Sequence, residues 1–412
     1  MLRILMFLAI LSPITMLAQT FELSGELRPR FENRHGYKTL PTPENEAAAF
    51  VSQRTRLNGL YSDAKVRVGF SMQDIRVWGD VPQLNRSDDH FSVHEAWGEL
   101  LFSDDVSLKA GRQEIVYDDS RIFGNVGWAQ QARSHDAALL KYQSGPMKLQ
   151  AGAALNRQKE LLFNEANPFG NYKAFQYFWG NYSADSWNVS LLALNTGYQS
   201  PVDDLGTVYN QTLGGRLVYN PGSLFLSAAS YLQTGEDANT NDLNASYLKL
   251  DAAYQLTSGW KFGAGYEMLS GNDQDADGDE NNAFTPIFGT NHKFNGWMDY
   301  FYVGNHANSV GLNDMYFSVN YQKNKISSGV KAHLFSADGD IMDPQNNTET
   351  LDSGLGTEVD LHLKYKFSGN TTLSAGYSRM FATESMEALK GGDADESADW
   401  LWLMITIKPK FL

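Results

Sequence analysis

The clearest pattern in this chain is a regular alternation of apolar and polar residues over long segments. From Val359 to Phe367 every odd position is apolar, and from Glu358 to Lys366 every even position is charged or histidine. The same period of two recurs at 21–32, 147–156, 260–268 and 401–411. Successive side chains of a strand point to opposite faces, so each segment is predicted to form a strand with one apolar face.

Two sizes of polar segment separate these strands. Short turns rich in Gly, Pro, Asn, Asp and Ser begin near residues 62, 103, 144, 184, 220, 257, 323 and 368. Longer polar segments lie near 35–46, 80–90, 116–133, 159–171, 198–206, 235–243, 271–310, 338–355 and 385–398. Such alternation is typical of outer-membrane proteins, whose short turns face the periplasm and whose long loops are extracellular. It predicts an all-β fold, a single antiparallel transmembrane β-barrel of about 18 strands, although 271–310 is long enough to contain another hairpin.

Both ends of the chain favour the same compartment. The last strand, with Leu401, Leu403 and Ile405 on one parity, is followed by Phe411, and a terminal aromatic is usual where such barrels close. At the other end Arg3 precedes an apolar run that is shorter than the roughly 20 residues needed to span a bilayer. We therefore expect a secretory signal peptide at 1–18 and a barrel domain at 19–412, surrounded by outer-membrane lipid.

The net charge of −15 is concentrated in the presumed outer loops. Four windows, 235–243, 271–282, 338–352 and 384–399, hold 3, 5, 5 and 6 of the 48 acidic residues. The rest of the chain is nearly balanced, so the charge of the barrel wall differs from that of the surface. An acidic surface disfavours nucleic acid as a partner, and the absence of cysteine excludes a disulfide scaffold.

Basic residues occupy the polar parity of the first strands. An Arg or Lys on the lipid face near mid-bilayer costs roughly 2–4 kcal/mol, so these side chains are expected to face the lumen. Rings of bases can select anions. The alternative is a network of salt bridges that stiffens the lumen, since acids lie on the same parity. The pairs are Arg28 with Arg30, Arg54 with Arg56, and Lys65 with Arg67.

Several segments resemble the alginate-export family of outer-membrane barrels. These are VHEAWGEL at 93–100, LKAGRQE at 108–114, RIFG at 121–124 and RSHDA at 133–137. GTNHKFNGWMDY at 289–300 is similar to a loop of the Bacteroidetes-type members. The resemblance implies an eighteen-stranded barrel with a lumen rich in Arg and Lys that passes a polyuronate. We call the paired bases of the first strands the basic ladder. The ladder and the resemblance together give the expected anion-binding lining: Arg28, Arg30, Arg54, Arg56, Lys65, Arg67, Lys109, Arg112, Arg216 and Lys364.

Arg112 is the difficult member of this set. Simple alternation from Val106, Leu108 and Ala110 points it toward lipid. Either a bulge at Gly111 turns it inward, or it lies beyond the apolar band.

Other chemistry is weakly indicated. Asp273, Asp275, Asp277 and Gly278 match the opening of a Ca²⁺ loop, but its twelfth position is Phe284 rather than the bidentate Glu of the full motif. A solvated acidic loop is the alternative to a weak Ca²⁺ site. The eight histidines show no metal-binding spacing, and no motif indicates catalytic residues or a cofactor.

The sequence therefore predicts an outer-membrane channel through which an anionic polysaccharide or oligosaccharide, such as an alginate-like polyuronate, diffuses passively. Segment 271–310 is expected to form the lid or constriction. A general or nutrient-uptake porin is the alternative of the same architecture, and a barrel enzyme is the alternative from another class. A periplasmic export or uptake partner is compatible with either direction of transport.

Overall fold

The structure is a computed structural model that describes residues 19–412 except 86, 88, 168–171, 204, 277, 307 and 308. The expected signal peptide at 1–18 and Asp277 of the candidate Ca²⁺ loop lie outside the described residues. Within the described part, no helix has both the length and the apolar character that a membrane crossing requires.

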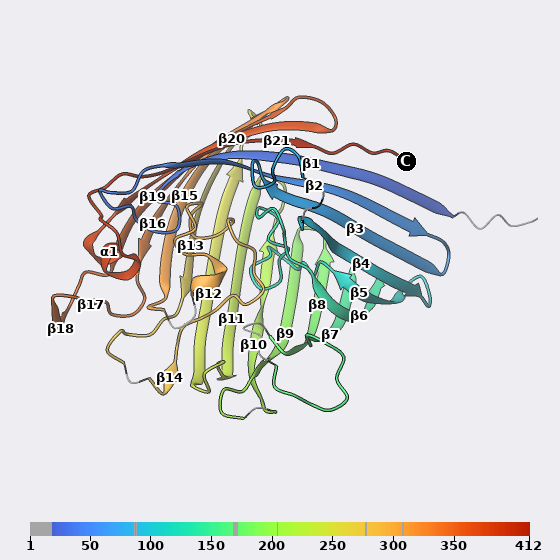
Figure 1. Cartoon of the computed structure of the whole chain (residues 1–412), viewed down its shortest axis with the longest axis horizontal. Coiled ribbons are helices and arrows are strands. Elements are labelled where there is room, and N and C mark those ends of the chain that lie inside the picture. Colours follow the sequence, from blue (N-terminus) through green and yellow to red (C-terminus); the bar gives the residue numbers. More distant parts are fainter. Residues whose placement is uncertain are drawn as a thin grey trace, which may run out of the picture.

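Eighteen long strands of the described chain form one closed antiparallel barrel (Figure 1). They are β1 Thr20–His35, β2 Ala48–Ser62, β3 Val66–Val77, β4 Phe91–Leu101, β5 Val106–Gln113, β6 His135–Ser144, β7 Met147–Leu155, β8 Ala174–Ala184, β9 Trp187–Gln199, β10 Thr207–Tyr219, β11 Leu224–Glu236, β12 Asp242–Gln255, β13 Trp260–Leu269, β15 Leu312–Lys323, β16 Ile326–Ser336, β19 Gly354–Lys366, β20 Thr371–Ala382 and β21 Ala398–Ile407. The smaller elements lie in the long loops: β14 Glu280–Asn281, β17 Met342–Asp343, β18 Asn346–Thr350, a 3₁₀ turn Val303–Asn305 and α1 Glu384–Lys390.

The barrel closes between its first and last strands. β1 pairs with β2 from Thr20↔Ser62 to Arg34↔Ala48, and on its other edge with β21 from Leu27↔Ile407 to His35↔Asp399. All eight predicted short turns join consecutive strands, and the predicted strand number is confirmed. Segment 271–310 adds only β14, a two-residue strand parallel to the start of β12, so it contributes no hairpin to the wall.

The alternation of the sequence separates a lipid-facing side from an inner side. On β19, Leu361 and Leu363 are 43% and 50% exposed, whereas Glu358 and Asp360 are fully buried. At the short-turn end, aromatic rings pair across neighbouring strands, Trp187 with Tyr219 at 4.3 Å and Trp260 with Tyr321 at 4.8 Å between centroids. Such pairs suit the aromatic girdle of a membrane barrel.

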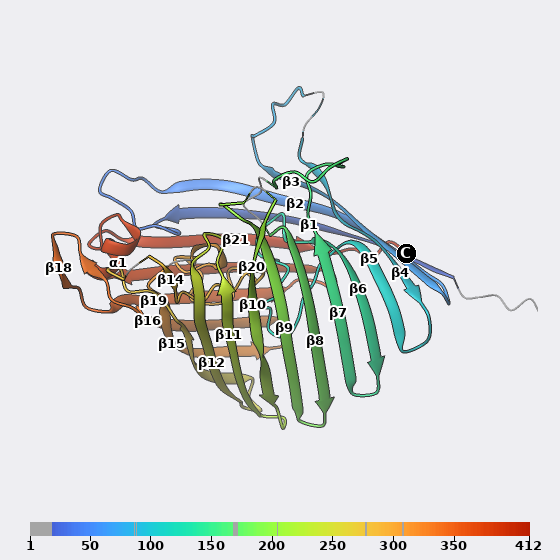
Figure 2. The ribbon, with the colours of Figure 1, turned by 90° about the horizontal axis from the view of Figure 1, so that it is seen from below.

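The wall has an uneven height. β1 and β2 have 16 and 15 residues, whereas β5, β6 and β7 have 8, 10 and 9. Figure 2 shows β5–β7 as a low stretch of the wall beside the longer β8–β12. The long loops that follow β5 and β7 therefore leave the wall after shorter strands than those of β1 and β2.

Two of the long loops fold into the barrel. We call residues 114–134, between β5 and β6, the first inner loop, and residues 282–311, between β14 and β15, the second inner loop. They lie across the inside of the curved sheet (Figure 1). Phe123 and Phe288 stack at 5.2 Å and belong to an aromatic cluster with Phe175 and Tyr177 of β8. The apolar core of the molecule is therefore inside the barrel, between the loops and the wall.

Candidate channel interior

The two inner loops are joined to each other through their backbones. Gly124 N donates to Phe288 O at 2.8 Å, and Thr290 N donates to Ser120 O at 2.9 Å. These bonds satisfy backbone groups that would otherwise be left without partners inside the barrel. The two loops are therefore hydrogen-bonded into one body inside the barrel. The constriction expected in 271–310 stays a prediction.

Buried polar side chains of the wall hold the second inner loop. The carboxylate of Glu358 on β19 accepts a hydrogen bond from Met298 N at 2.8 Å. Asn295 Nδ2 donates to Glu267 of β13 at 2.8 Å. Arg121 of the first inner loop lies 3.0 Å from the same Glu267, and both side chains are at most 2% exposed. This depth of burial makes these groups structural anchors rather than a surface for solute.

The arginines of β1 and β2 hold the first inner loop in the same way. Arg28 donates to the backbone oxygens of Gly127 at 2.8 Å and Trp128 at 3.1 Å, and to Gln130 Oε1 at 2.9 Å. Arg30 donates to Trp128 O at 2.8 Å and lies over the Trp128 ring at 4.1 Å. The structure therefore places these two residues on the lumen parity but covers them with the loop.

Arg54 completes this group. It donates to Glu26 Oε1 at 3.0 Å and to Gln130 O at 3.1 Å. Arg28, Arg30 and Arg54 are 7%, 5% and 4% exposed. We call these three residues the arginine brace. Arg56, the next base of the ladder, is less enclosed and donates to Gln73 Oε1 at 2.7 Å.

Three more of the expected lining residues, Lys65, Arg67 and Lys364, lie at or near the short-turn end. Arg67 is 48% exposed at the side chain, 3.8 Å from Glu99. Lys364 is exposed on the inner parity of β19. Lys65 corrects the prediction, since it lies in the turn before β3 and is not in the wall. The Asp63 side chain accepts hydrogen bonds from the backbone of Lys65 and Val66, which closes that turn.

Arg112 is also placed differently from the expected lining. The register of β5 with both neighbours is continuous through Gly111, so no bulge turns Arg112 inward. It lies on the outward parity near the end of β5 and pairs with Asp136 at 2.9 Å. Both side chains are half exposed, at 44% and 60%. The bulge of this region is instead between β3 and β4, at Ser71/Met72.

Arg216 takes part in a cluster that sequence reasoning did not assemble. Asp119, at the tip of the first inner loop, lies 3.4 Å from Lys249 and 3.7 Å from Arg216. Lys293 of the second inner loop donates to the backbone oxygen of Asp119. Burial alone would raise the pKa of Asp119, but the neighbouring Lys249 and Arg216 outweigh it and hold the pKa below its usual value. Asp119 and Lys293 are loop residues, so strand alternation could not have identified them.

Three interior lysines lie over aromatic rings. Lys109 Nζ is 3.9 Å from the centroid of Trp97, Lys331 Nζ is 3.9 Å from that of Tyr316, and Lys293 Nζ is 5.5 Å from that of Phe294. Within the described residues, none of the three has a carboxylate at ion-pair distance. We call them the uncompensated lysines. A cation over a ring gains about 0.5–1 kcal/mol at an exposed site.

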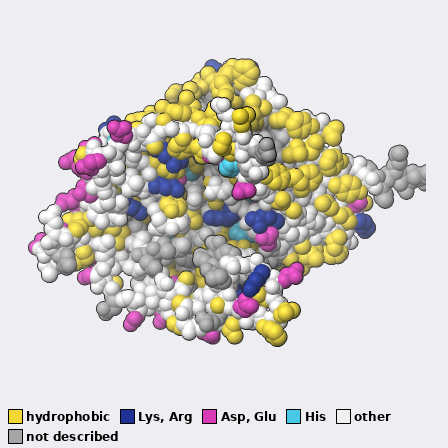
Figure 3. All heavy atoms as spheres, viewed as in Figure 1, with side chains coloured by type: hydrophobic (Ala, Val, Ile, Leu, Met, Phe, Trp, Pro, Cys, Tyr) yellow, Lys and Arg dark blue, Asp and Glu magenta, His cyan; other side chains and the backbone are white. Residues whose placement is uncertain are grey.

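Figure 3 shows how charge is distributed on the face seen in Figure 1. Lys and Arg side chains gather near the middle of the face, and most Asp and Glu side chains lie toward its edges. In the described part of the chain, no three His, Asp or Glu side chains come together as a metal site. Asp273 instead accepts a hydrogen bond from Asp340 N at 2.8 Å. The Ca²⁺ site stays a prediction because Asp277 is not described.

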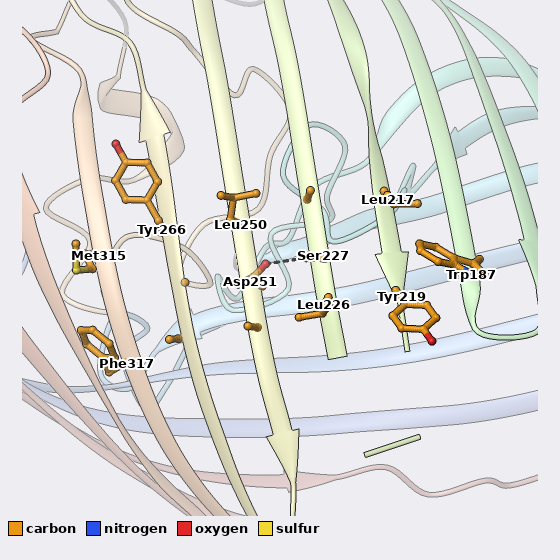
Figure 4. A pocket seen from close by; sticks show the side chains of 14 residues that line it. Trp187, Leu217, Tyr219, Leu226, Ser227, Leu250, Asp251, Tyr266, Met315 and Phe317 are labelled. Carbon is orange, nitrogen blue, oxygen red and sulfur yellow. Dashed lines mark hydrogen bonds between the residues drawn. The ribbon is translucent and has the colours of Figure 1, made fainter. Parts of the chain in front are cut away.

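A hollow on the wall between β9 and β15 is of a different kind. Figure 4 shows large apolar side chains, among them Leu217, Leu250 and Phe317, around it. These three are 41%, 46% and 52% exposed on the lipid-facing parity, and small residues such as Ala252 form the floor. Asp251 points away from this face and accepts a hydrogen bond from Ser227 at 2.9 Å. The hollow is therefore part of the membrane boundary and not of the conduction path.

Known proteins with this architecture are outer-membrane porins. Pseudomonas aeruginosa OpdK has a TM-score of 0.61 at 12% identity, covering 95% of this chain and 99% of that chain. OccD3 (OpdP) of the same organism has a TM-score of 0.61 at 15% identity, covering 97% and 93%. A structure of OpdK with vanillate has a TM-score of 0.60 at 12% identity, covering 95% and 99%. At these identities the likeness shows the fold.

No curated protein sequence matches this chain. Its sequence does match the family described as alginate export, over residues 20–398. This match covers most of the chain, and the segments noted above lie within it. The family and the porin fold together indicate a channel of the bacterial outer membrane and not an enzyme. The chain belongs to the alginate export family of outer-membrane β-barrel proteins.

Proposed function

We propose that this channel passes saccharides that carry carboxylates, with uronic-acid oligomers as the cargo. The observation that supports this most directly is the set of uncompensated lysines. Lys109, Lys293 and Lys331 belong to the inner parity of the wall or to the second inner loop, and each is at least partly accessible. Within the described residues none of the three has a carboxylate at ion-pair distance, so a passing anion can take that place.

The mechanism is exchange between several weak sites. A carboxylate approaches one lysine, leaves it for the next, and is never held by a closed set of partners. Conduction requires binding strong enough to favour entry and weak enough to allow exit. The arginine brace does not take part directly, because backbone oxygens and Glu26 already occupy its donors. It keeps the first inner loop, and with it Asp119, in position.

A second candidate function is uptake of small carboxylates. The joined inner loops narrow the lumen, which suits small solutes. One structural relative, OpdK, has been crystallised with vanillate, a small aromatic carboxylate. In this case a monomeric acid would pass and an oligomer would not.

Single-channel recording in a planar bilayer tests the proposal. Wild-type protein is expected to prefer anions under a salt gradient and to be blocked by oligouronate. Lys109→Gln, Lys293→Gln and Lys331→Gln, combined, should reduce the ratio of anion to cation permeability by about threefold or more. These substitutions leave no carboxylate without a partner. The matched control is Lys65→Gln, Lys323→Gln and Lys325→Gln, three exposed bases at the short turns, which should keep the wild-type ratio.

Three results would contradict the proposal. An unselective wild-type current without oligouronate block would indicate a general porin. A current that is blocked by monouronate but not by oligouronate would favour uptake of small acids. Equal selectivity of the two triple variants would show that the uncompensated lysines do not set it.

A further inference from the structure

A hollow of about 810 Å³ lies at the long-loop end of β5–β7, the low stretch of the wall. Its basic lining residues are Arg112, Arg133 and Arg157, and its other walls include Tyr172, Phe288 and Tyr302. Arg112 comes from the end of β5, Arg157 from the loop after β7, and Phe288 from the second inner loop. The hollow therefore connects the outer rim with the loops that narrow the lumen. Ligand pockets typically have 300–1,000 Å³, so a sugar of one or two rings fits.

The hollow carries excess positive charge. Asp136 is the one carboxylate among its described lining residues, and it pairs with Arg112 at 2.9 Å. Arg133 donates to Gly289 O at 2.7 Å, and Arg157 donates to Glu165 O at 2.9 Å and Asn164 Oδ1 at 2.7 Å. These acceptors are neutral, and within the described residues neither arginine has a carboxylate at ion-pair distance. A guanidinium has five N–H donors, so both retain capacity for a carboxylate.

Burial lowers the pKa of Arg133 to about 10, which still leaves it charged at neutral pH. A buried charge without a counter-ion is costly unless another group compensates it. A bound anion would provide this compensation. This argument does not apply to the arginine brace, because carboxylates and backbone oxygens of the protein already compensate its charge.

Two buried polar atoms of the lining have no hydrogen-bond partner among the described residues. They are Nε2 of His135, a side chain only 4% exposed, and Oδ1 of Asn291. The other ring nitrogen of His135 lies 2.9 Å from the Tyr172 hydroxyl. When that hydroxyl donates to Nδ1, Nε2 carries the proton and can donate to a ligand. Buried polar groups are rarely left unpaired in folded proteins, so these two atoms are expected to pair with a water or with a polar ligand that displaces it.

We propose that this hollow, which we call the rim site, binds the terminal uronate of an anionic oligosaccharide at the outer mouth of the channel. Arg133 and Arg157 bind the carboxylate. His135 Nε2 donates a hydrogen bond to one ring hydroxyl, and Asn291 Oδ1 accepts one from another. The aromatic side chains pack on the apolar face of the sugar. The inference rests on the proposed function and adds a capture site to it. The rim site lies at the outer surface, so it acts on cargo present on that side.

Binding and block measured on the full-length protein test the rim site. A uronate trisaccharide is titrated into the purified barrel by calorimetry, with a neutral trisaccharide of the same linkage as the reference. Wild-type protein should bind the uronate, and Arg133→Gln with Arg157→Gln should weaken binding at least tenfold. In bilayers the double variant should weaken block from the extracellular side more than from the periplasmic side.

Two variants separate charge from folding. Among the described residues, the side chain of Arg157 donates hydrogen bonds only within its own loop, so Arg157→Gln alone should fold normally and weaken binding by several-fold. Arg133→Lys keeps the charge and should retain most of the affinity. The matched control is Arg379→Gln, which removes an arginine near the rim on β20 that already pairs with Asp399 at 3.5 Å. It should bind the uronate as the wild type does.

The outcomes distinguish this inference from the proposed function. If wild-type channels are anion-selective and blocked by oligouronate but the double variant binds normally, the rim site is wrong and the proposed function stands. If wild-type channels show neither property, the proposed function fails. Equal binding of the neutral trisaccharide, or binding of lipopolysaccharide phosphate without binding of uronate, would overturn the assignment of the rim site to a sugar acid.

Discussion

The arginine brace and the rim site contain the same kind of residue in opposite situations. In the brace, Arg28, Arg30 and Arg54 are at most 7% exposed and make hydrogen bonds to loop oxygens and to carboxylates. At the rim site, Arg133 and Arg157 donate only to neutral acceptors within the described residues. The N–H donors of the brace are occupied by partners within the protein, whereas the two arginines of the rim site still have N–H donors that a ligand can bind.

This difference shows that a row of arginines on the lumen parity is not in itself an anion pathway. Parity determines which side of the wall a side chain occupies. Whether it binds solute depends on whether the protein has already supplied its counter-charge. In this barrel three of the four ladder arginines of β1 and β2 hold the first inner loop, and the bases that we propose for conduction lie elsewhere.

The largest effect should come from breaking the brace. Arg54→Gln removes a buried partner of Glu26 and a donor to Gln130 O. Loss of one member of a buried pair should lower the free energy of unfolding by on the order of 3 kcal/mol. Urea unfolding followed by the electrophoretic shift of the folded barrel measures this. Arg67→Gln is the control, since Arg67 is half exposed and its interaction with Glu99 at 3.8 Å should contribute less than about 1 kcal/mol. Equal losses in the two variants would refute the distinction.

A smaller effect is expected for the ion pair on the outward parity of the rim. Arg112 and Asp136 are 44% and 60% exposed, although their separation of 2.9 Å is as short as that of pairs inside the barrel. A double-mutant cycle with Arg112→Ala and Asp136→Ala should give a coupling energy of about 0.2–1 kcal/mol. A coupling above about 2 kcal/mol would mean that this part of the rim is screened from water and more like the brace.

A pH-dependent effect is expected for the largely buried base at the end of α1. Lys390 at the end of α1 lies 5.0 Å from the Phe301 ring centroid, and burial lowers its pKa from 10.5 to about 8. Because the folded state binds this proton more weakly than the unfolded state, docking of α1 should strengthen as pH rises from 8 to 10.5. Hydrogen exchange of residues 383–391, corrected for intrinsic rates, should show severalfold more protection at pH 9.5 than at pH 7.5. Lys390→Met should show no such pH dependence.

The sequence alone predicted the barrel wall well. Strand alternation is a local property, so it identified the lipid-facing Leu361 and Leu363 and the inward Glu358 and Asp360 directly from their positions. Turn composition is also local, and all eight short turns were found where predicted. Lys65 shows the limit of this reasoning, since a residue next to a turn belongs to no face of the wall.

The tertiary structure determined which residues each basic side chain contacts. Arg28 contacts Gly127, 99 residues away, and no periodicity along the chain reports such a contact. The same holds for Asp119 between Arg216 and Lys249, and for Phe288 beside Arg133 at the rim site. The folding of two loops into the barrel is driven by burial of aromatic side chains and by pairing of backbone groups across long sequence separations. The sequence therefore determined where the wall is and which way its residues face, and only the packed loops decided which charges remain available to a solute.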